Sequence, residues 1–288
     1  MQTAQTHLAD STTVGMVELT VAGLDRSIGF YSDRLGLEVL DRNDAWAAMG
    51  VADTELLRLQ ALPGARRSYH ATGLYHFAVR VPDRHSLARW LARAIELQTP
   101  IDGASDHYVS EAIYLHDPDG HGIEIYADRP RRVWEGRLSE MGALRALNIR
   151  DLLAQLDGTE PPMTKLPPGT DMGHIHLQVR DIPETIAFYR DVVGFDLTME
   201  YGDSAAFFSA GGYHHHIGTN TWHSKGAGPS QDDTAALQFA TIVLDSEEER
   251  RAVVERVRAA GHDAHVDGDD VLIQDPSGIS LRLDWASR

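Results

Sequence analysis

The sequence predicts an α+β protein built from four copies of a small module, each with the strand and helix order βαβββ. Three observations lead to this fold. Two pairs of stretches match along the chain, two Asp-Pro-x-Gly tetrads mark equivalent hairpins, and a proline-rich stretch separates the two halves. Self-similar stretches at a regular spacing indicate repeated supersecondary units, so they decide the architecture before any single element does.

The first pair of matching stretches covers residues 17–37 and 175–195. Each stretch has the pattern of a strand, a short amphipathic helix, a glycine stop and a further strand. The helices are predicted to begin at Ser27 and Thr185, and their apolar faces carry Phe30-Tyr31 and Phe188-Tyr189.

The second pair of matching stretches begins with the strands predicted at 74–79 and 237–242. Helical patterns follow at about 84–97 and 246–260, and each copy ends in a hairpin. In these hairpins proline fixes φ and glycine supplies the unusual backbone angle that a tight turn needs. The two turns are Asp117-Pro118-Asp119-Gly120 and Asp275-Pro276-Ser277-Gly278.

Four modules are therefore expected, at residues 14–61, 72–128, 172–219 and 235–285. The prolines between residues 161 and 168 mark the boundary between the halves. The predicted organisation is an N-terminal domain over 1–130, a linker over 131–170 with a short helix near 149–156, and a C-terminal domain over 171–288.

The composition excludes several classes of partner and chemistry. The formal net charge of −17 opposes attraction to phosphate backbones or anionic lipids, so neither nucleic acid nor membrane is an expected partner. No apolar run approaches membrane-spanning length, and the polar residues 1–13 lack a signal core. The absence of cysteine excludes disulfides and thiolate ligands and indicates a cytoplasmic protein. With 15 histidines, any metal would be held by imidazole and carboxylate.

The modules resemble those of the vicinal oxygen chelate superfamily, which contains glyoxalases, bleomycin resistance proteins and extradiol dioxygenases. Within it, the chain is similar to the bacterial catechol-2,3-dioxygenases of the CatE type. The resemblance covers nearly the whole chain, and it implies two cupped mixed sheets with metal ligands on first and last strands. The segments that carry it are Gly73-Leu74-Tyr75-His76-Phe77, Asp106-His107-Tyr108-Val109-Ser110-Glu111-Ala112, Gly173-His174-Ile175-His176-Leu177 and Gly212-Tyr213-His214-His215-His216-Ile217-Gly218.

Placing the ligand positions of this superfamily on the four modules predicts one metal site. First-strand positions are Met16, His76, His174 and Gln238, and last-strand positions of the even modules are Glu124 and Arg282. If modules one and two paired, their site would be one ligand short. If modules three and four paired, the Arg282 guanidinium would repel the cation. Pairing modules two and three gives His76, His174 and Glu124, the two-histidine, one-carboxylate set of non-heme Fe(II) oxygenases. Modules one and four would then form a metal-free cup.

Alternatives stay open for these ligands. A lone histidine is more often a surface or core residue than a ligand, and Glu124 alternates with apolar residues as on the polar face of a strand. His176 lies two residues from His174, on the same strand face, and competes with it for the ligand role. If His174 is the ligand, His176 is expected to bind substrate.

The resemblance also implies acid–base groups around the metal. The Gly-x-His-His pattern places His215 on the catalytic histidine of extradiol enzymes, inside a predicted strand, with His214 and His216 on the opposite face and His214 near the substrate. Tyr114 is expected to anchor the substrate hydroxyl, and His107 to act beside it; an ordinary core role for Tyr114 and a surface role for the histidine run are the alternatives. His116 and His121, on the hairpin before Glu124, are expected to be loop or surface residues.

Together, these expectations predict that the protein is an extradiol ring-cleaving dioxygenase. It would use Fe(II), with Mn(II) as the alternative, to insert O₂ into a catechol or hydroquinone-type aromatic. The alternatives are a glyoxalase-like metal-dependent isomerase or lyase, and a metal-free protein that sequesters a small molecule. The expected partners are a small aromatic substrate and O₂, and a homo-oligomer is compatible with the sequence.

Overall fold

A computed structural model describes residues 7–138 and 145–286 of the chain, so part of the N-terminal polar stretch, residues 1–6, lies outside the described residues. The chain forms two compact units. The first unit contains Met1–Glu18, Ser68–Tyr75 and Gly173–Arg288, and the second contains Leu19–Arg67 and His76–Met172. In the part of the chain that the structure describes, no helix is long and apolar enough to cross a membrane.

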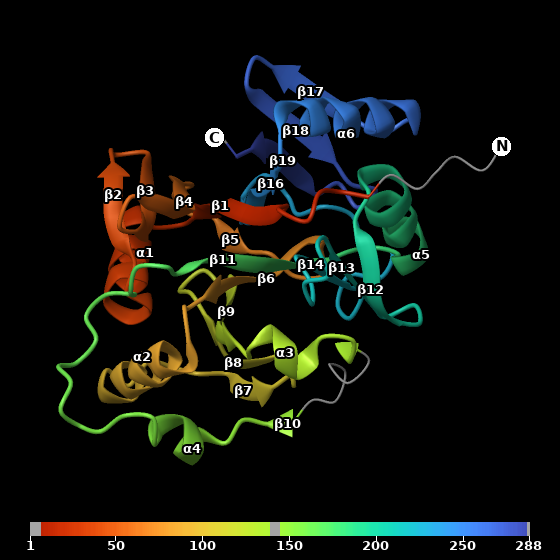
Figure 1. Cartoon of the computed structure of the whole chain (residues 1–288). Helices are drawn as coiled ribbons and strands as arrows, with labels where there is room; N and C mark the ends of the chain where they lie inside the picture. Colours follow the sequence, from red (N-terminus) through yellow and green to blue (C-terminus); the bar gives the residue numbers. More distant parts are fainter. Residues whose placement is uncertain (1–6, 139–144, 287–288) are drawn as a thin grey trace. The chain divides into compact units, whose positions relative to one another are not determined.

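Four βαβββ modules follow one another in the described residues, as the repeat predicts (Figure 1). The first contains β1 (Thr13–Val21), α1 (Leu24–Phe30), the π-helical turn η1 (Tyr31–Leu35), β2 (Glu38–Arg42), β3 (Trp46–Val51) and β4 (Thr54–Ala61). The second contains β6 (Gly73–Arg80), α2 (Arg84–Glu96), β7 (Gly103–Asp106), β8 (Ser110–His116) and β9 (Gly122–Asp128). The third contains β11 (Asp171–Gln178), α5 (Ile182–Ile186), the π-helical turn η3 (Ala187–Val193), β12 (Asp196–Tyr201), β13 (Ala205–Ser209) and β14 (Ile217–Asn220). The fourth contains β16 (Leu237–Leu244), α6 (Glu247–Ala259), β17 (Ala264–Asp267), β18 (Asp270–Gln274) and β19 (Ser280–Trp285).

The modules contribute to two mixed sheets. Among the described residues, one sheet has eight strands in the order β17-β18-β19-β16-β1-β4-β3-β2, and the other has nine in the order β10-β7-β8-β9-β6-β11-β14-β13-β12. Strands of modules four and one therefore share one sheet, and strands of modules two and three share the other, which confirms the predicted pairing. The remaining short elements are β5 (Arg66–Arg67), α3 (Arg131–Trp134), β10 (Arg145–Ala146), α4 (Ile149–Leu153) and β15 (Thr234–Ala235).

The short helices begin three residues before the predicted starts at Ser27 and Thr185. In α5 the side chain of Asp181 caps the helix by accepting a hydrogen bond from the backbone N–H of Glu184. Thr185 is buried inside the helix, where its hydroxyl bonds back to the carbonyl of Asp181. The aspartate is thus the helix start signal, and the threonine belongs to the buried face.

The glycine stops act as predicted. Gly36 and Gly194 follow the π-helical turns η1 and η3 with φ of 97° and 108°, in the left-handed region. A side chain at this φ would strain the backbone, so glycine is the residue that ends a helix here and lets the chain enter the next strand.

A tyrosine–aspartate hydrogen bond joins the modules in each unit. The Tyr31 hydroxyl donates to the Asp117 carboxylate at 2.9 Å, and the Tyr189 hydroxyl donates to Asp275 at 3.0 Å. Both aspartates begin the Asp-Pro-x-Gly turns, where their other oxygen accepts two backbone N–H groups. Burial raises the pKa of the Asp275 carboxyl to about 6, against the lowering effect of these donors. The tyrosine of each Phe-Tyr pair and the aspartate of each turn therefore form one buried contact.

We expect Tyr189→Phe to lower the free energy of unfolding by about 1–3 kcal/mol, because it leaves a buried carboxylate oxygen without its donor. Urea unfolding measures this change. Tyr201→Phe is the matched control, since the side chain of Tyr201 is exposed. Equal stabilities of the two variants would contradict the assigned role of the contact.

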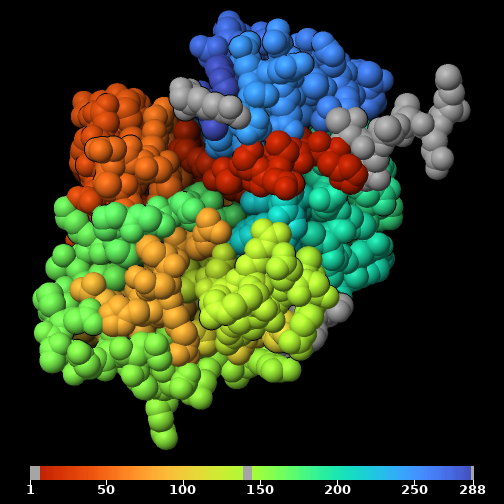
Figure 2. All heavy atoms as spheres, in the orientation of Figure 1, coloured from red at the N-terminus to blue at the C-terminus, as the bar shows by residue number. Residues whose placement is uncertain are grey.

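The linker packs along helix α2 in the second unit. Arg89 donates to the carbonyl of Pro161, and His85 pairs with Glu160 at 2.7 Å. Figure 2 shows the green surface of this segment around the yellow-orange surface of α2. On its inner side α2 buries Trp90, whose indole N–H donates to the carbonyl of Leu35. The linker is thus a structural part of the second unit.

Candidate metal and substrate site

His76 and Glu124 lie together on neighbouring strands of the second unit. Strands β6 and β9 are parallel, with Ala78 opposite Glu124. His76 is two residues before Ala78 and therefore on the same sheet face. The His76 Nε2 atom is 3.1 Å from a Glu124 carboxylate oxygen, and the residues are 6 % and 3 % exposed. A buried imidazole nitrogen and a carboxylate oxygen converge here, as two ligands of one cation would.

Tyr114 and His107 extend this cluster. Tyr114 on β8 is the register partner of Glu124, and its ring centroid is 5.7 Å from that of His76. The Tyr114 hydroxyl is 2.5 Å from His107 Nε2. The structure therefore brings together four of the side chains that the sequence assigned to the site, with the histidine of the β7–β8 loop against the tyrosine hydroxyl.

His174 belongs to a second cluster of imidazoles, in the first unit. It is buried on β11, and its ring centroid is 4.2 Å from that of His215. His215 Nδ1 is 2.9 Å from His214 Nδ1. At this distance one Nδ1 atom donates a hydrogen bond and the other accepts it, so the two Nδ1 atoms bind each other.

The histidine run precedes a strand instead of lying within one. Strand β14 begins at Ile217, and the rings of His214 and His215 face each other, so the prediction that they alternate across a strand is wrong. The physical reason is the preceding Gly211-Gly212 pair, with φ of 60° and 65°, which turns the chain and delays the strand.

His176 lies over a glycine on the same face of the sheet in the first unit. His176 and Phe207 are both register partners of Gly218. A Cβ atom at Gly218 would be 3.1 Å from the His176 ring and 3.3 Å from Phe207. The His176 ring also meets the edge of Tyr75, with centroids 5.1 Å apart, and Tyr75 contacts the exposed Trp222. Gly218 thus allows a continuous group of aromatic rings from the surface to His176.

We expect Gly218→Ala to lower the free energy of unfolding by about 1–3 kcal/mol, because the added methyl group overpacks His176 and Phe207. Thermal unfolding followed by circular dichroism measures this. Gly228→Ala is the matched control, since a Cβ there meets nothing within 4 Å. If the two variants melted together, the close packing over Gly218 would be refuted.

The fourth module replaces both ligand types of the second. Thr241 is opposite Arg282, as Ala78 is opposite Glu124, so the equivalent of His76 is Phe239. The predicted assignment of Gln238 to this position is therefore wrong by one residue. The Arg282 guanidinium lies 5.8 Å from the centre of the Phe239 ring, a cation–π contact in place of a histidine–carboxylate pair. This position in module four therefore lacks metal ligands.

Two further histidines of the second module have different surroundings. His116 is exposed and 2.6 Å from an Asp102 carboxylate oxygen, as a surface residue would be. His121 lies in the loop between β8 and β9, as expected, but it is buried, with Nε2 3.0 Å from the carbonyl of Thr20. The Asp-Pro-Asp-Gly turn folds inward because Asp117 accepts the His121 backbone N–H.

Comparisons with known proteins agree with this architecture. The family model of the glyoxalase/bleomycin resistance protein/dioxygenase superfamily matches residues 13–125 and 171–283. A catechol-2,3-dioxygenase of Bacillus subtilis (strain 168) is 43 % identical over 94 % of this chain and 96 % of its own length.

Solved structures show the same fold at low sequence identity. A putative dioxygenase from Bacillus subtilis has a TM-score of 0.69 at 14 % identity, covering 99 % of this chain and 87 % of its own. Glyoxalase I from Zea mays has a TM-score of 0.58 at 16 % identity, covering 95 % and 92 %. With both repeats matched by the family model and a full-length relative at 43 % identity, the chain belongs to the glyoxalase/bleomycin resistance protein/dioxygenase superfamily.

Proposed function

We propose that this protein is a metal-dependent extradiol dioxygenase that cleaves the ring of a catechol or hydroquinone-type aromatic, in aromatic compound catabolism in the cytoplasm. The observation that carries the proposal is the buried His76–Glu124 pair, in a chain 43 % identical to a catechol-2,3-dioxygenase over nearly its full length. Oxygen and a small aromatic are the proposed partners. The fold alone would leave the reaction open, because one fold supports many chemistries.

We assign the metal to His76, Glu124 and His174, three buried side chains that each offer one ligand atom. The donor set is nitrogen and oxygen without sulfur, which suits Fe(II), with Mn(II) as the alternative. When bound, such a metal would supply Lewis-acid and redox chemistry toward the aromatic substrate and O₂.

His174 is favoured over His176 as the second histidine ligand. His176 packs against Gly218 and contacts the rings of Phe207 and Tyr75, a setting suited to packing against an aromatic substrate. His174 occupies the position in module three that module two fills with His76. We therefore assign His176, with His214, to the substrate.

His215 is the proposed acid–base group. A catechol must lose a proton as it binds, and a proton must return as the ring opens. A histidine suits both steps because its pKa usually lies near neutrality. With Nδ1 held by His214, we assign the transfer to His215 Nε2.

Tyr114 is the proposed anchor of the substrate hydroxyl. Its own hydroxyl is 2.5 Å from His107 Nε2, so His107 fixes the direction in which the phenol can donate or accept. This pair would orient the aromatic ring against the metal ligands on the same sheet face, where Tyr114 is opposite Glu124.

Oxygen uptake tests the proposal. Protein loaded with Fe(II) under anaerobic conditions and then given catechol and air should consume one O₂ per catechol and form a yellow ring-opened product. The uptake should be absent from His76→Ala. No uptake with catechol, hydroquinone or their methylated forms, despite bound metal, would reject ring cleavage and point to an isomerase or lyase of the same superfamily.

A further inference from the structure

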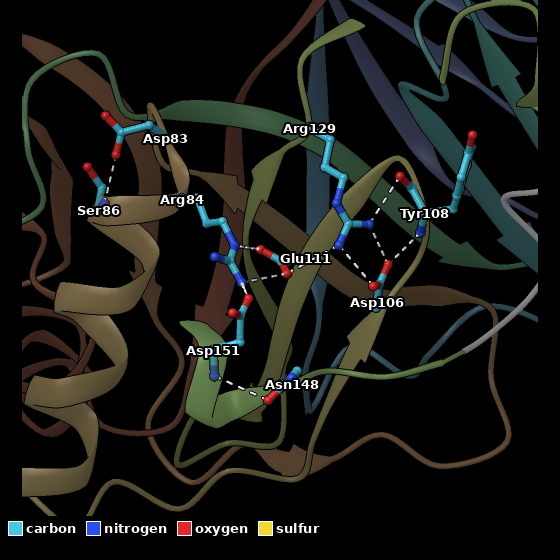
Figure 3. A network of polar contacts seen from close by, with 9 residues as sticks. All are labelled: Asp83, Arg84, Ser86, Asp106, Tyr108, Glu111, Arg129, Asn148 and Asp151. Carbon is cyan, nitrogen blue, oxygen red and sulfur yellow. Dashed lines mark hydrogen bonds and ion pairs between the residues drawn. The ribbon is translucent and has the colours of Figure 1, made fainter. Parts of the chain in front are cut away.

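Arg129 binds the loop between β7 and β8, which carries His107. The Arg129 guanidinium donates to both Asp106 carboxylate oxygens, at 2.5 and 2.9 Å, and to the Tyr108 carbonyl at 3.2 Å. The backbone N–H of Arg129 donates to the carbonyl of Val109. Figure 3 shows Arg129 facing Asp106 and Tyr108 across this loop. Arg129, the first residue after β9, thus binds both neighbours of His107 in the chain.

Arg129 is itself fixed by a buried carboxylate. Its guanidinium donates to Glu111, which is 4 % exposed, at 3.2 Å. Arg84 donates to the other oxygen of Glu111 at 2.5 Å and also to Asp151 of α4 (Figure 3). Charges of opposite sign therefore alternate from the loop to the first residue of α2, and each buried charge has a partner.

The loop needs such support because its backbone is strained. Tyr108, the residue after His107, has φ of 70°, in the left-handed region that a side chain disfavours. Its backbone N–H donates to Asp106, the same carboxylate that binds Arg129. A conformation of this kind is unfavourable and persists where surrounding contacts enforce it. The direction of the His107 side chain depends on that enforced turn.

We propose that Arg129 is a positioning residue for the His107–Tyr114 pair, acting through the Asp106–Tyr108 turn. The inference rests on the proposed function, in which this pair orients the substrate. The side chain of Arg129 contacts Asp106, Tyr108 and Glu111. Loss of its guanidinium should therefore affect turnover through the loop while the His76–Glu124 pair stays in place.

We expect Arg129→Gln to lower kcat about 10–100-fold with metal content unchanged, since a displacement on the order of 1 Å at a reacting group can cost that much. Arg58→Gln is the matched control. Arg58 in β4 makes a similar bidentate pair with Glu55, at comparable exposure, and its loss should leave kcat at the wild-type value.

A double-mutant comparison separates positioning from general destabilisation. In a His107→Ala background, Arg129→Gln should change kcat by less than about twofold, because the group that it positions is gone. An equal fall in both backgrounds, or wild-type kcat in Arg129→Gln alone, would overturn the proposal.

A spectroscopic measurement keeps this inference distinct from the proposed function. In protein loaded with diamagnetic Zn(II) and labelled on histidine and tyrosine, the nuclear Overhauser effect between the His107 and Tyr114 rings should be present in wild type and Arg58→Gln and lost in Arg129→Gln. An enzyme without ring-cleaving activity would reject the proposed function alone. A ring contact that survives in Arg129→Gln would reject the positioning role, whatever the activity.

Discussion

Replacing His76 by alanine is expected to remove the bound metal and the ring-cleaving activity together. The substitution deletes an imidazole whose Nε2 is 3.1 Å from the Glu124 carboxylate, and leaves that buried carboxylate without its neighbour. Replacing a residue that only hydrogen-bonds a metal ligand lowers metal affinity about 10–100-fold. Removing a ligand itself should therefore lower metal affinity by more than about 100-fold. Metal per chain after dialysis, measured by mass spectrometry, and oxygen uptake check this result.

His116→Ala provides the control for a lost histidine in the same module, because His116 is exposed and pairs with Asp102. It should keep its metal and its activity. Circular dichroism of both variants excludes unfolding as the cause. A His76→Ala protein that retained one metal per chain would show that the ligands lie elsewhere.

The second large effect is expected from His215→Asn, which should lower kcat about 10²–10⁴-fold, the usual contribution of general acid–base catalysis. The amide keeps a polar group near His214 but cannot exchange a proton near neutral pH. The metal should stay, since the proposed ligands are unchanged. Steady-state rates of oxygen uptake, with metal content measured on the same samples, test both halves of this expectation.

His223→Asn in the same unit is the matched control, because its side chain is exposed. Two results would count against the role of His215. An unchanged kcat would remove it from proton transfer, and loss of the metal would make it a ligand in place of His174, whose ring lies 4.2 Å away.

Most of the fold follows from local patterns that recur. The repeated Phe-Tyr pair and the Asp-Pro-x-Gly turns located the modules, and the structure explains the link as a buried hydrogen bond between Tyr31 and Asp117. The missed helix starts have a local cause as well. A capping aspartate, Asp181, is a stronger start signal than the buried Thr185 that follows it.

Only part of the candidate site could be predicted from the sequence. Positions set by strand alternation and by repeat alignment, such as His76, Glu124 and Tyr114, were predictable and lie together. The bend at the histidine run depends on two consecutive left-handed glycines, which composition alone does not reveal. Arg129 and Glu111 are 18 residues apart, and no sequence signal identifies which of many arginines meets a buried carboxylate.

The most direct test of ring cleavage is the fate of oxygen. Fe(II)-loaded protein given catechol under ¹⁸O₂ should yield a ring-opened product with both labelled atoms, provided its aldehyde is reduced at once to stop oxygen exchange with water, because a dioxygenase inserts the whole molecule. Product with one labelled atom, or unlabelled product, would contradict the proposed reaction even if oxygen were consumed.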